Sequence, residues 1–258
     1  MKGSIIMSAN AFEKIKEGLA GIGVKPGDDL LIHSSFKSLG YVEGGIKTFV
    51  EAVISYLGDR GTLLMPALTY ANVTPLNPVF DVRDTKSCVG AVSEFFRTYD
   101  GVRRSINATH SVCAYGFKRD EYVGTHINDD CPIGENSPLY KLHELGGKIL
   151  MVGCSLRPNT SMHGVETKAG APYILSDETR TYTLIDENDK KIHKDMRYHT
   201  ISLNGFRQRY DRIEGLIDVA KGNILEAECF LMNSADVWKA GVEKIHKDTY
   251  FFVDKIEE

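Results

Sequence analysis

The sequence predicts an α/β fold, a single domain in which helices flank a mixed central sheet. Short apolar stretches of strand length, at residues 29–33, 61–65 and 148–153, alternate with longer segments whose apolar residues recur at helical spacing. The 258-residue chain also contains no internal repeat, no low-complexity tract and no change of composition that would mark a linker. We therefore expect one domain over residues 1–258.

Helices and strands are predicted to alternate along the chain. Ser8 has the side chain of an N-cap and is followed by apolar residues at helical spacing, so the first helix is expected from Ser8 to Ala20. The same spacing predicts a second helix at 46–57. The remaining expected elements are strands at 111–115, 180–185, 191–201 and 226–232, helices at 89–99, 139–145 and 235–247, and irregular loops at 70–87 and 131–138.

The composition disfavours several classes of protein. A hydrophobic content of 42% with 26% charged residues is typical of a soluble globular protein. The net charge of −4 gives no reason to expect nucleic acid or an anionic membrane as a partner, and no apolar run approaches the roughly 18–20 residues of a membrane span. The apolar stretch near the N-terminus is too short for a signal peptide. Five scattered cysteines, an odd number, favour buried thiols in a reducing cytoplasm over a disulfide framework or a zinc site.

The most informative segment is residues 159–166, which follow a predicted buried strand. The chain leaves this strand through a short polar loop and enters a helix, for which Thr160 or Ser161 is the expected N-cap. His163 falls in the first turn of this helix and Glu166 lies three residues later, so the two side chains share a face. The positive end of the helix dipole disfavours a protonated imidazole, which suits a general base. Ligands of α/β proteins also gather at the carboxyl ends of strands.

Two other interpretations of this pair are open at this point. A histidine and a glutamate at this spacing often form an ion pair with a purely structural role. The same spacing can hold a metal, but such a site would need a second helix with a carboxylate and a histidine, and none is evident. We therefore expect no metal, and a metal-dependent hydrolase with His163 and Glu166 as ligands is a competing hypothesis.

Three further turns that are rich in glycine, serine or histidine lie at residues 33–40, 104–111 and 134–139. None has the spacing of a Walker A loop or of a dinucleotide-binding G-x-G-x-x-G, which disfavours a nucleoside triphosphatase and a Rossmann dehydrogenase. Together with the His163 loop, these segments resemble the aminoglycoside 3-N-acetyltransferase family in order and spacing. The matching stretches are His33-Ser34-Ser35 with Leu39-Gly40, the strand at 61–66, Gly101 to Ser105 with His110-Ser111, Gly134 with Ser137-Pro138-Leu139, and Asn159-Thr160-Ser161 with His163 and Glu166.

The resemblance implies direct transfer of an acetyl group from acetyl-coenzyme A to an amine, typically on the deoxystreptamine ring of an aminoglycoside. His163 would be the base, and Glu166 would orient its imidazole as an acidic group does in a catalytic triad. Residues 1–170 would form the coenzyme-binding core with the catalytic loop, and residues 171–258 the acceptor side. The residues implied to bind the coenzyme are Ser34, Ser35, Phe36 and Lys37, with Arg104, Ser105, His110 and Ser111 opposite, and one of these donors would hold the oxyanion.

Two alternatives to direct transfer are considered. Cys154 lies at the end of the strand that leads to His163, so a covalent acyl-enzyme is conceivable, although it would need an activated thiolate and a buried structural thiol is more common. The chain could also be a non-catalytic relative that binds a sugar or the coenzyme. A pure binder has no use for a base, which favours the enzyme.

Two features depart from the family pattern. Asn107-Ala108 stands where the family usually has His-Pro, which puts the coenzyme contacts there in doubt. Between residues 180 and 212, eight lysines and arginines outnumber five acidic residues, and Arg207 and Arg209 follow Phe206 in a basic run.

The basic run bears on the acceptor, which is expected to be a small-molecule amine. Arg207 and Arg209 would repel a polycation but would suit a carboxylate or a phosphate, so we expect them to bind the acceptor together with Tyr70, which begins the long loop at 70–87. An amino sugar attached to a nucleotide diphosphate is the alternative to an antibiotic, and a solvated helix face is the other interpretation of the run. A homodimer is considered as the assembly.

Overall fold

A mixed seven-stranded sheet forms the centre of the structure, a computed structural model that describes the backbone of residues 2–256 and the side chains of residues 11–256. The three central strands β6, β1 and β2 run parallel, and the strands at both sides are antiparallel to their neighbours, which confirms the predicted mixed sheet. In spatial order the strands are β10 (Ala220–Ile224), β11 (Ala227–Asn233), β6 (Lys148–Val152), β1 (Asp29–Ser34), β2 (Thr62–Pro66), β5 (Val112–Gly116) and β4 (Arg103–Arg104).

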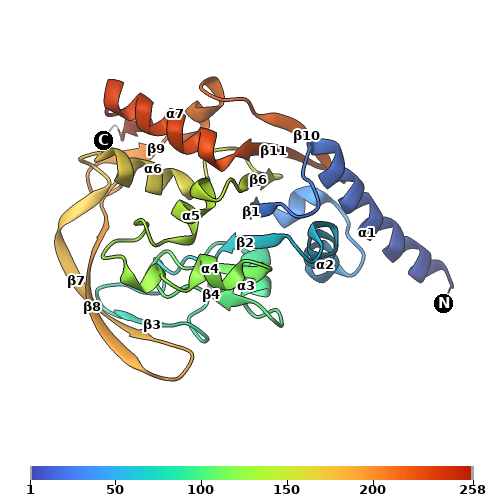
Figure 1. The fold of residues 1–258 in the computed structure, drawn as a ribbon, viewed down its shortest axis with the longest axis horizontal. Helices are drawn as coiled ribbons and strands as arrows, with labels where there is room; N and C mark the ends of the chain where they lie inside the picture. The colour runs from blue at the N-terminus through green and yellow to red at the C-terminus, as the bar shows by residue number, and fades with distance from the viewer. Residues whose placement is uncertain (1, 257–258) are drawn as a thin grey trace.

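Helices cover both faces of this sheet (Figure 1). Successive strand residues point to opposite faces, so Leu30 joins one apolar core and Leu31 the other. The Leu30 face packs against α1 (Lys2–Ile22), α2 (Gly45–Leu57) and α3 (Ala91–Arg97). The Leu31 face packs against α5 (Pro138–Glu144), α6 (Ser161–Ala169) and α7 (Ser234–Lys247).

A long antiparallel ribbon, β7 (Leu175–Ile185) with β8 (Lys191–His199), curves along one side of the molecule and pairs with β3 (Val79–Asp81) (Figure 1). A small core that includes Phe80 and Leu184 lies beneath it. Further along the chain, β9 (Phe206–Gln208) pairs with β12 (Val253–Lys255) and leads into the 3₁₀ helix η3 (Tyr210–Gly215). The remaining short elements are η1 (Phe36–Leu39), α4 (Arg119–Val123) and η2 (His126–Asn128).

Most predicted elements occur within a few residues of their expected bounds. Two predictions were wrong: α1 begins at Lys2, so Ser8 lies inside the helix and is not its N-cap, and the segment 70–87, expected to be irregular, contains the strand β3. The basic run after residue 204 forms the strand β9 and a 3₁₀ helix, which does not fit the alternative interpretation as a solvated helix face. Within the described residues, no helix has both the length and the apolar character that crossing a bilayer requires.

The helix that carries His163 is held in place by α7. A Cβ atom on Gly164 would lie 2.4 Å from the Trp238 ring, so glycine permits the close approach of α6 to α7. The Trp238 indole N–H donates a hydrogen bond of 2.8 Å to the Ser161 hydroxyl in the first turn of α6. Both contacts are buried, and they fix the position of the first turn of α6 relative to the sheet.

Candidate active site

A cleft of about 610 Å³ opens at the carboxyl ends of the parallel strands, the edge at which ligands of such sheets usually bind. The loops after β2 and β6 contribute to it, as do the loop before β5, the end of β8 and the segment around η3. Its lining residues are Leu68, Tyr70, Val89, His110, Ser155, Arg157, Pro158, Asn159, Thr160, His163, His199, Ile201, Ser202, Gln208 and Tyr210.

The loop between β6 and α6 is fixed by hydrogen bonds at its polar residues. The Asn159 side-chain oxygen accepts from the Ser161 N–H at 3.1 Å. Thr160 stands at the predicted N-cap position, but its side chain does not cap the helix. The Thr160 backbone N–H instead donates to Nε2 of His33 at 3.1 Å, and the Thr160 hydroxyl lies 3.2 Å from the same atom. Burial lowers the pKa of His33 to about 3, so its Nε2 stays an acceptor.

His163 and Glu166 are joined through a tyrosine rather than directly. Their nearest side-chain atoms, Nδ1 and Oε2, are 3.8 Å apart. The Tyr210 hydroxyl lies between them, 2.9 Å from His163 Nδ1 and 2.7 Å from Glu166 Oε2. The other Glu166 oxygen accepts from the Tyr173 hydroxyl at 3.1 Å, and the carboxylate is fully buried. Two tyrosines therefore supply the hydrogen bonds that a buried carboxylate requires.

This chain of hydrogen bonds determines which imidazole nitrogen is free. Burial and the charge of Glu166 raise the pKa of Tyr210 well above its ordinary value, so the phenol keeps its single hydrogen. The phenol donates that hydrogen to Oε2 of Glu166. The His163 Nδ1–H must then donate to the tyrosine oxygen, which leaves the lone pair on Nε2. The geometry thus favours the tautomer of His163 that a general base needs.

Two further histidines lie beside His163 in the cleft. The His110 ring centroid is 5.6 Å from that of His163, and the His199 centroid is 4.6 Å from it. His110 belongs to the turn before β5, where the Asn107 side chain accepts from the Thr109 and His110 backbone N–H groups. The departure from His-Pro at 107–108 thus places a buried asparagine that holds His110 in position.

The residues predicted to bind the coenzyme fall into two groups. Ser34 ends β1, and Ser35, Phe36 and Lys37 follow it at the same sheet edge; all four keep accessible surface, although they do not line the cleft itself. Arg104, Ser105 and Ser111 are buried. The Arg104 guanidinium donates to Ser111 and to the carbonyls of Ala67, Val82 and Thr85, and Ser105 bonds the ring of His126.

Arg104, Ser105 and Ser111 therefore have a structural role, because their buried side chains hold neighbouring loops together by hydrogen bonds. Direct contact with a coenzyme would require their internal hydrogen bonds to be broken, and unpaired buried polar groups are costly. Of the residues predicted on the opposite side of the coenzyme, His110 alone lines the cleft.

The predicted role of Arg207 and Arg209 in acceptor binding is not supported by their positions. Neither lines the cleft; the neighbouring residues Gln208, at the end of β9, and Tyr210, at the start of η3, line it instead. Arg209 donates to Asp211 and to Asp254, and Arg207 lies 3.7 Å from Asp254. The two arginines belong to an ion-pair network between β9, η3 and β12. Tyr70, by contrast, lines the cleft, a position compatible with the predicted role in acceptor binding.

Cys154 does not have the surroundings of an activated nucleophile. Burial raises the pKa of its thiol to about 11, and no basic group is among the causes of the shift. The sulfur lies 3.6 Å from the His33 carbonyl oxygen. All five cysteines of the chain are free thiols.

Sequence reasoning missed three functional candidates: His33, His199 and Tyr210. His33 stood within a quoted motif, but its contact with Thr160 spans 127 residues of sequence. Tyr210 lies 44 residues from Glu166, inside the basic run, and no local pattern marks it. His199 ends β8 and reaches the cleft only because the ribbon curves toward α6.

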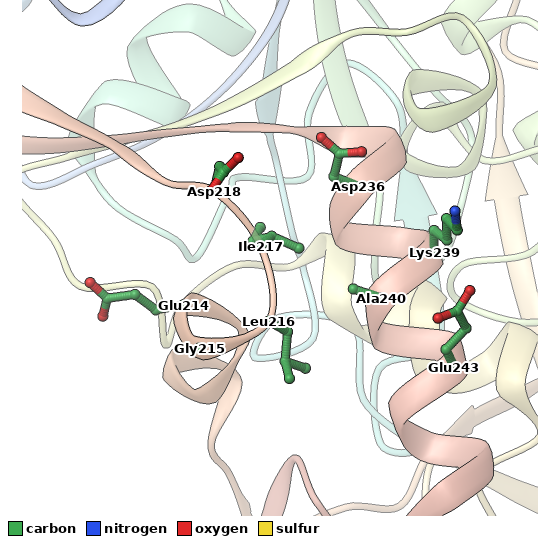
Figure 2. A pocket seen from close by; sticks show the side chains of 9 residues that line it. All are labelled: Glu214, Gly215, Leu216, Ile217, Asp218, Asp236, Lys239, Ala240 and Glu243. Atoms are coloured by element: carbon green, nitrogen blue, oxygen red, sulfur yellow. The ribbon is translucent and has the colours of Figure 1, made fainter.

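A second hollow, of about 570 Å³, lies between residues 214–218 and α7 (Figure 2). Its lining is mostly acidic: Glu214 and Asp218 come from the first segment, and Asp236 and Glu243, together with Lys239, come from α7. Its lining, all within the described part of the chain, includes no histidine, cysteine, serine or threonine. This hollow therefore offers neither a nucleophile nor a base suited to neutral pH, and the His163 cleft is the candidate active site.

The sequence is similar to those of known aminoglycoside acetyltransferases and of a related protein. Aminoglycoside N(3)-acetyltransferase IV from Salmonella is 33% identical over a match that covers 60% of this chain and 58% of that protein. The aminoglycoside N(3')-acetyltransferase-like protein YokD of Bacillus subtilis is 27% identical, over 63% of this chain and 70% of that protein. The match with the Salmonella protein thus spans less than two thirds of its length.

Solved structures extend the similarity over nearly the whole chain. The crystal structure of YokD superposes with a TM-score of 0.79 at 23% identity, covering 92% of this chain and 99% of that one. AAC-IIIb, in a binary complex with CoASH, superposes with a TM-score of 0.77 at 24% identity, covering 92% and 97%. The family model described as aminoglycoside 3-N-acetyltransferase matches residues 31–246. The chain therefore belongs to the aminoglycoside 3-N-acetyltransferase family.

Proposed function

We propose that this chain is an acetyl-coenzyme A-dependent N-acetyltransferase in which His163 is the general base. The observation that carries the proposal is the hydrogen-bonded chain from Glu166 through Tyr210 to Nδ1 of His163, in a cleft at the carboxyl ends of the parallel strands. A sensor or scaffold would gain nothing from fixing the tautomer of a histidine in this way. The family membership supports the same reaction.

In the proposed reaction, Nε2 of His163 takes a proton as the acceptor amine attacks the thioester carbonyl. The C–N bond forms, the tetrahedral intermediate collapses, the C–S bond breaks, and the thiolate of coenzyme A leaves. The positive charge on the imidazolium is stabilised by the buried Glu166 carboxylate through the Tyr210 hydroxyl. General base catalysis of this kind is typically worth about 10²–10⁴ in rate.

The coenzyme is proposed to approach along Ser34 to Lys37. Ser34 is the last residue of β1, which lies between β6 and β2, and the other three follow it directly. The ring of the neighbouring His33 accepts a hydrogen bond from the loop that precedes His163. A displacement of residues 34–37 is therefore expected to reach His163 through the contact between His33 and Thr160. The structure of AAC-IIIb with CoASH shows that a protein of this fold binds the coenzyme.

The acceptor is proposed to be an amino sugar that is not a polycation. Among the described residues that line the cleft, none is an aspartate or a glutamate, and Arg157, whose Nε lies 3.7 Å from an Asp211 oxygen, is the arginine among them. The carboxylate of Glu166 behind the lining is already bonded to two tyrosines. An aminoglycoside with several ammonium groups would find no counter-charge in the cleft, whereas an amino sugar bearing a phosphate or a carboxylate could pair with Arg157.

The proposal is tested by thiol release from acetyl-coenzyme A with a panel of amines. His163→Ala is expected to lower kcat by about 10²–10⁴ while coenzyme binding, followed by calorimetry, stays intact. His246→Ala, which removes an exposed histidine on α7, is the matched control and should behave as the wild type. Near-normal turnover by His163→Ala would overturn the assignment of the base.

The acceptor is tested separately, with kanamycin-type aminoglycosides and nucleotide-linked amino sugars in the same assay. A higher kcat/KM for the nucleotide-linked sugars would support the proposed class. Efficient turnover of the antibiotics with none of the sugars would refute it and would leave the reaction itself established.

A further inference from the structure

Three imidazoles from distant parts of the chain meet in the cleft. His110 comes from the turn before β5, His163 from the first turn of α6, and His199 from the end of β8. One ligand atom from each lies within 4.8 Å of the others. The His110 and His199 rings are 4.5 Å apart between centroids and almost perpendicular, at 76°.

Each of the three rings has a nitrogen available toward this point. Nδ1 of His163 is bonded to Tyr210 and Nδ1 of His110 lies 2.9 Å from the Thr109 hydroxyl, so Nε2 is the available atom in both. Nε2 of His199 is buried without any hydrogen-bond partner. A buried polar atom without a partner is costly, and a ligand that it could bind would remove that cost.

The outer contacts are those that usually accompany a metal-binding histidine. Such a histidine generally holds its second nitrogen against a carboxylate, a carbonyl or a hydroxyl, which fixes the ring and its tautomer. The Tyr210 hydroxyl, itself bonded to Glu166, contacts Nδ1 of His163 in this way, and the Thr109 hydroxyl contacts Nδ1 of His110.

We infer that His110, His163 and His199 form a binding site for a divalent transition metal of the Zn²⁺ class, with water in the fourth position. Three neutral histidines and a water are an established ligand set for zinc. Bonds of about 2.0–2.1 Å place tetrahedral ligands roughly 3.4 Å apart. The three nitrogens, which lie within 4.8 Å of one another, would therefore have to move closer together when the ion binds.

The inferred metal is not a cofactor of acetyl transfer. It would occupy the lone pair of His163 Nε2, the atom that the proposed reaction uses as the base, so metal and acceptor amine exclude each other. This consequence depends on the proposed function, but the metal site itself does not. Zinc would then act as a reversible inhibitor, removed by a chelator.

The site is tested on metal-free protein without a histidine tag, coenzyme or acceptor, titrated with Co²⁺ and then with Zn²⁺. We expect one equivalent of Co²⁺ to bind with the intense visible bands of a four- or five-coordinate ion, and Zn²⁺ to abolish them. His199→Ala and His110→Ala should each weaken binding by at least about 10-fold, whereas His246→Ala should not. His199→Gln serves as a second variant, and thermal unfolding of each apo-protein shows that it is folded.

Two results would overturn the inference. One is the absence of Co²⁺ bands together with no Zn²⁺ binding by calorimetry. The other is binding that the His110 and His199 substitutions leave unchanged. Both outcomes are independent of acetyl transfer, so they can be distinguished from a failure of the proposed function. In an active preparation, loss of thiol release on adding Zn²⁺ and its recovery with a chelator would support the shared use of His163.

Discussion

The parts of the chain before and after residue 171 both contribute side chains to the cleft, but in different ways. Before residue 171, the site residues lie in short loops directly after strands, and the strand ends bring them together. After it, His199, Gln208 and Tyr210 reach the cleft through a curved ribbon and a 3₁₀ segment that carry no recognisable motif. The first region contributes the proposed base, His163, and the second contributes the tyrosine hydroxyl that lies 2.9 Å from its Nδ1.

The difference teaches that charge in a sequence is a poor guide to what lines a site. The arginines of the second region suggested an anion-binding surface, yet they pair with Asp211 and Asp254 outside the cleft. The uncharged Tyr210, next to Arg209 in the chain, is the residue that touches His163.

The largest expected effect concerns this tyrosine. Tyr210→Phe removes the hydroxyl between Glu166 and His163, so the Nδ1–H loses its acceptor and the wrong tautomer becomes populated. We expect kcat to fall on the order of 10²-fold, with little change in the Kd of the coenzyme. Steady-state thiol release and calorimetry measure the two quantities.

Tyr173→Phe is the matched control for this substitution. It also removes a hydroxyl that donates to Glu166, but one that does not contact His163. Both variants should lose stability by about 1.5–3 kcal/mol, as for a hydrogen bond to a charged group. Equal losses of kcat in the two variants would show that Tyr210 matters only for folding, and the contrast between the two regions would disappear.

The next effect concerns the packing that holds the first region in place. Gly164→Ala places a methyl group 2.4 Å from the Trp238 ring and 2.8 Å from Ile133, so α6 must move or the rings must shift. Overpacking of this kind typically costs about 1–3 kcal/mol. Urea unfolding measures the loss, and kcat should fall with it because His163 is the preceding residue.

Gly21→Ala in α1 is the control for this prediction. A Cβ atom there meets nothing within 4 Å, so the substitution should stabilise the helix by roughly 0.5–1 kcal/mol. A similar gain in stability at Gly164 would mean that the α6–α7 contact is looser than described.

A smaller effect is expected from pH, through His33. Burial of the ring lowers the pKa of His33 in the folded protein to about 3, below the ordinary histidine value of about 6.5, so the unfolded chain binds the proton first. The contribution to stability is complete above about pH 6.5 and is lost as the pH falls toward 3, at up to about 1.4 kcal/mol per pH unit. His33→Gln should reduce the slope of unfolding free energy against pH between 6 and 5 by about this amount. An unchanged slope would mean that the ring is already charged in the folded state.

Much of the fold was predictable because each core element carries its own pattern. The alternation that separates Leu30 from Leu31, and the helical spacing at 46–57, depend only on neighbouring residues. The position of His163 was also predictable from neighbouring residues, because a strand, a polar loop and the start of a helix follow one another directly in the sequence. The partners of Glu166 could not be predicted in this way, because long-range packing brings Tyr210 to it.

The smallest expected effect is at the arginines. Arg207→Ala and Arg209→Ala should lower the melting temperature slightly, since they remove members of the network with Asp254, but should leave the KM of every acceptor unchanged. Arg157→Ala, inside the cleft, is the matched substitution and should raise the KM of an acceptor that carries a phosphate. If Arg207→Ala raised that KM instead, the basic run would regain the acceptor role that its composition suggested. Arg207 would then have to face the cleft, on the opposite side of β9 from the one that it occupies. Turning the faces of β9 over requires a one-residue slip of its register with β12, and the observed pairing of the two strands opposes such a slip.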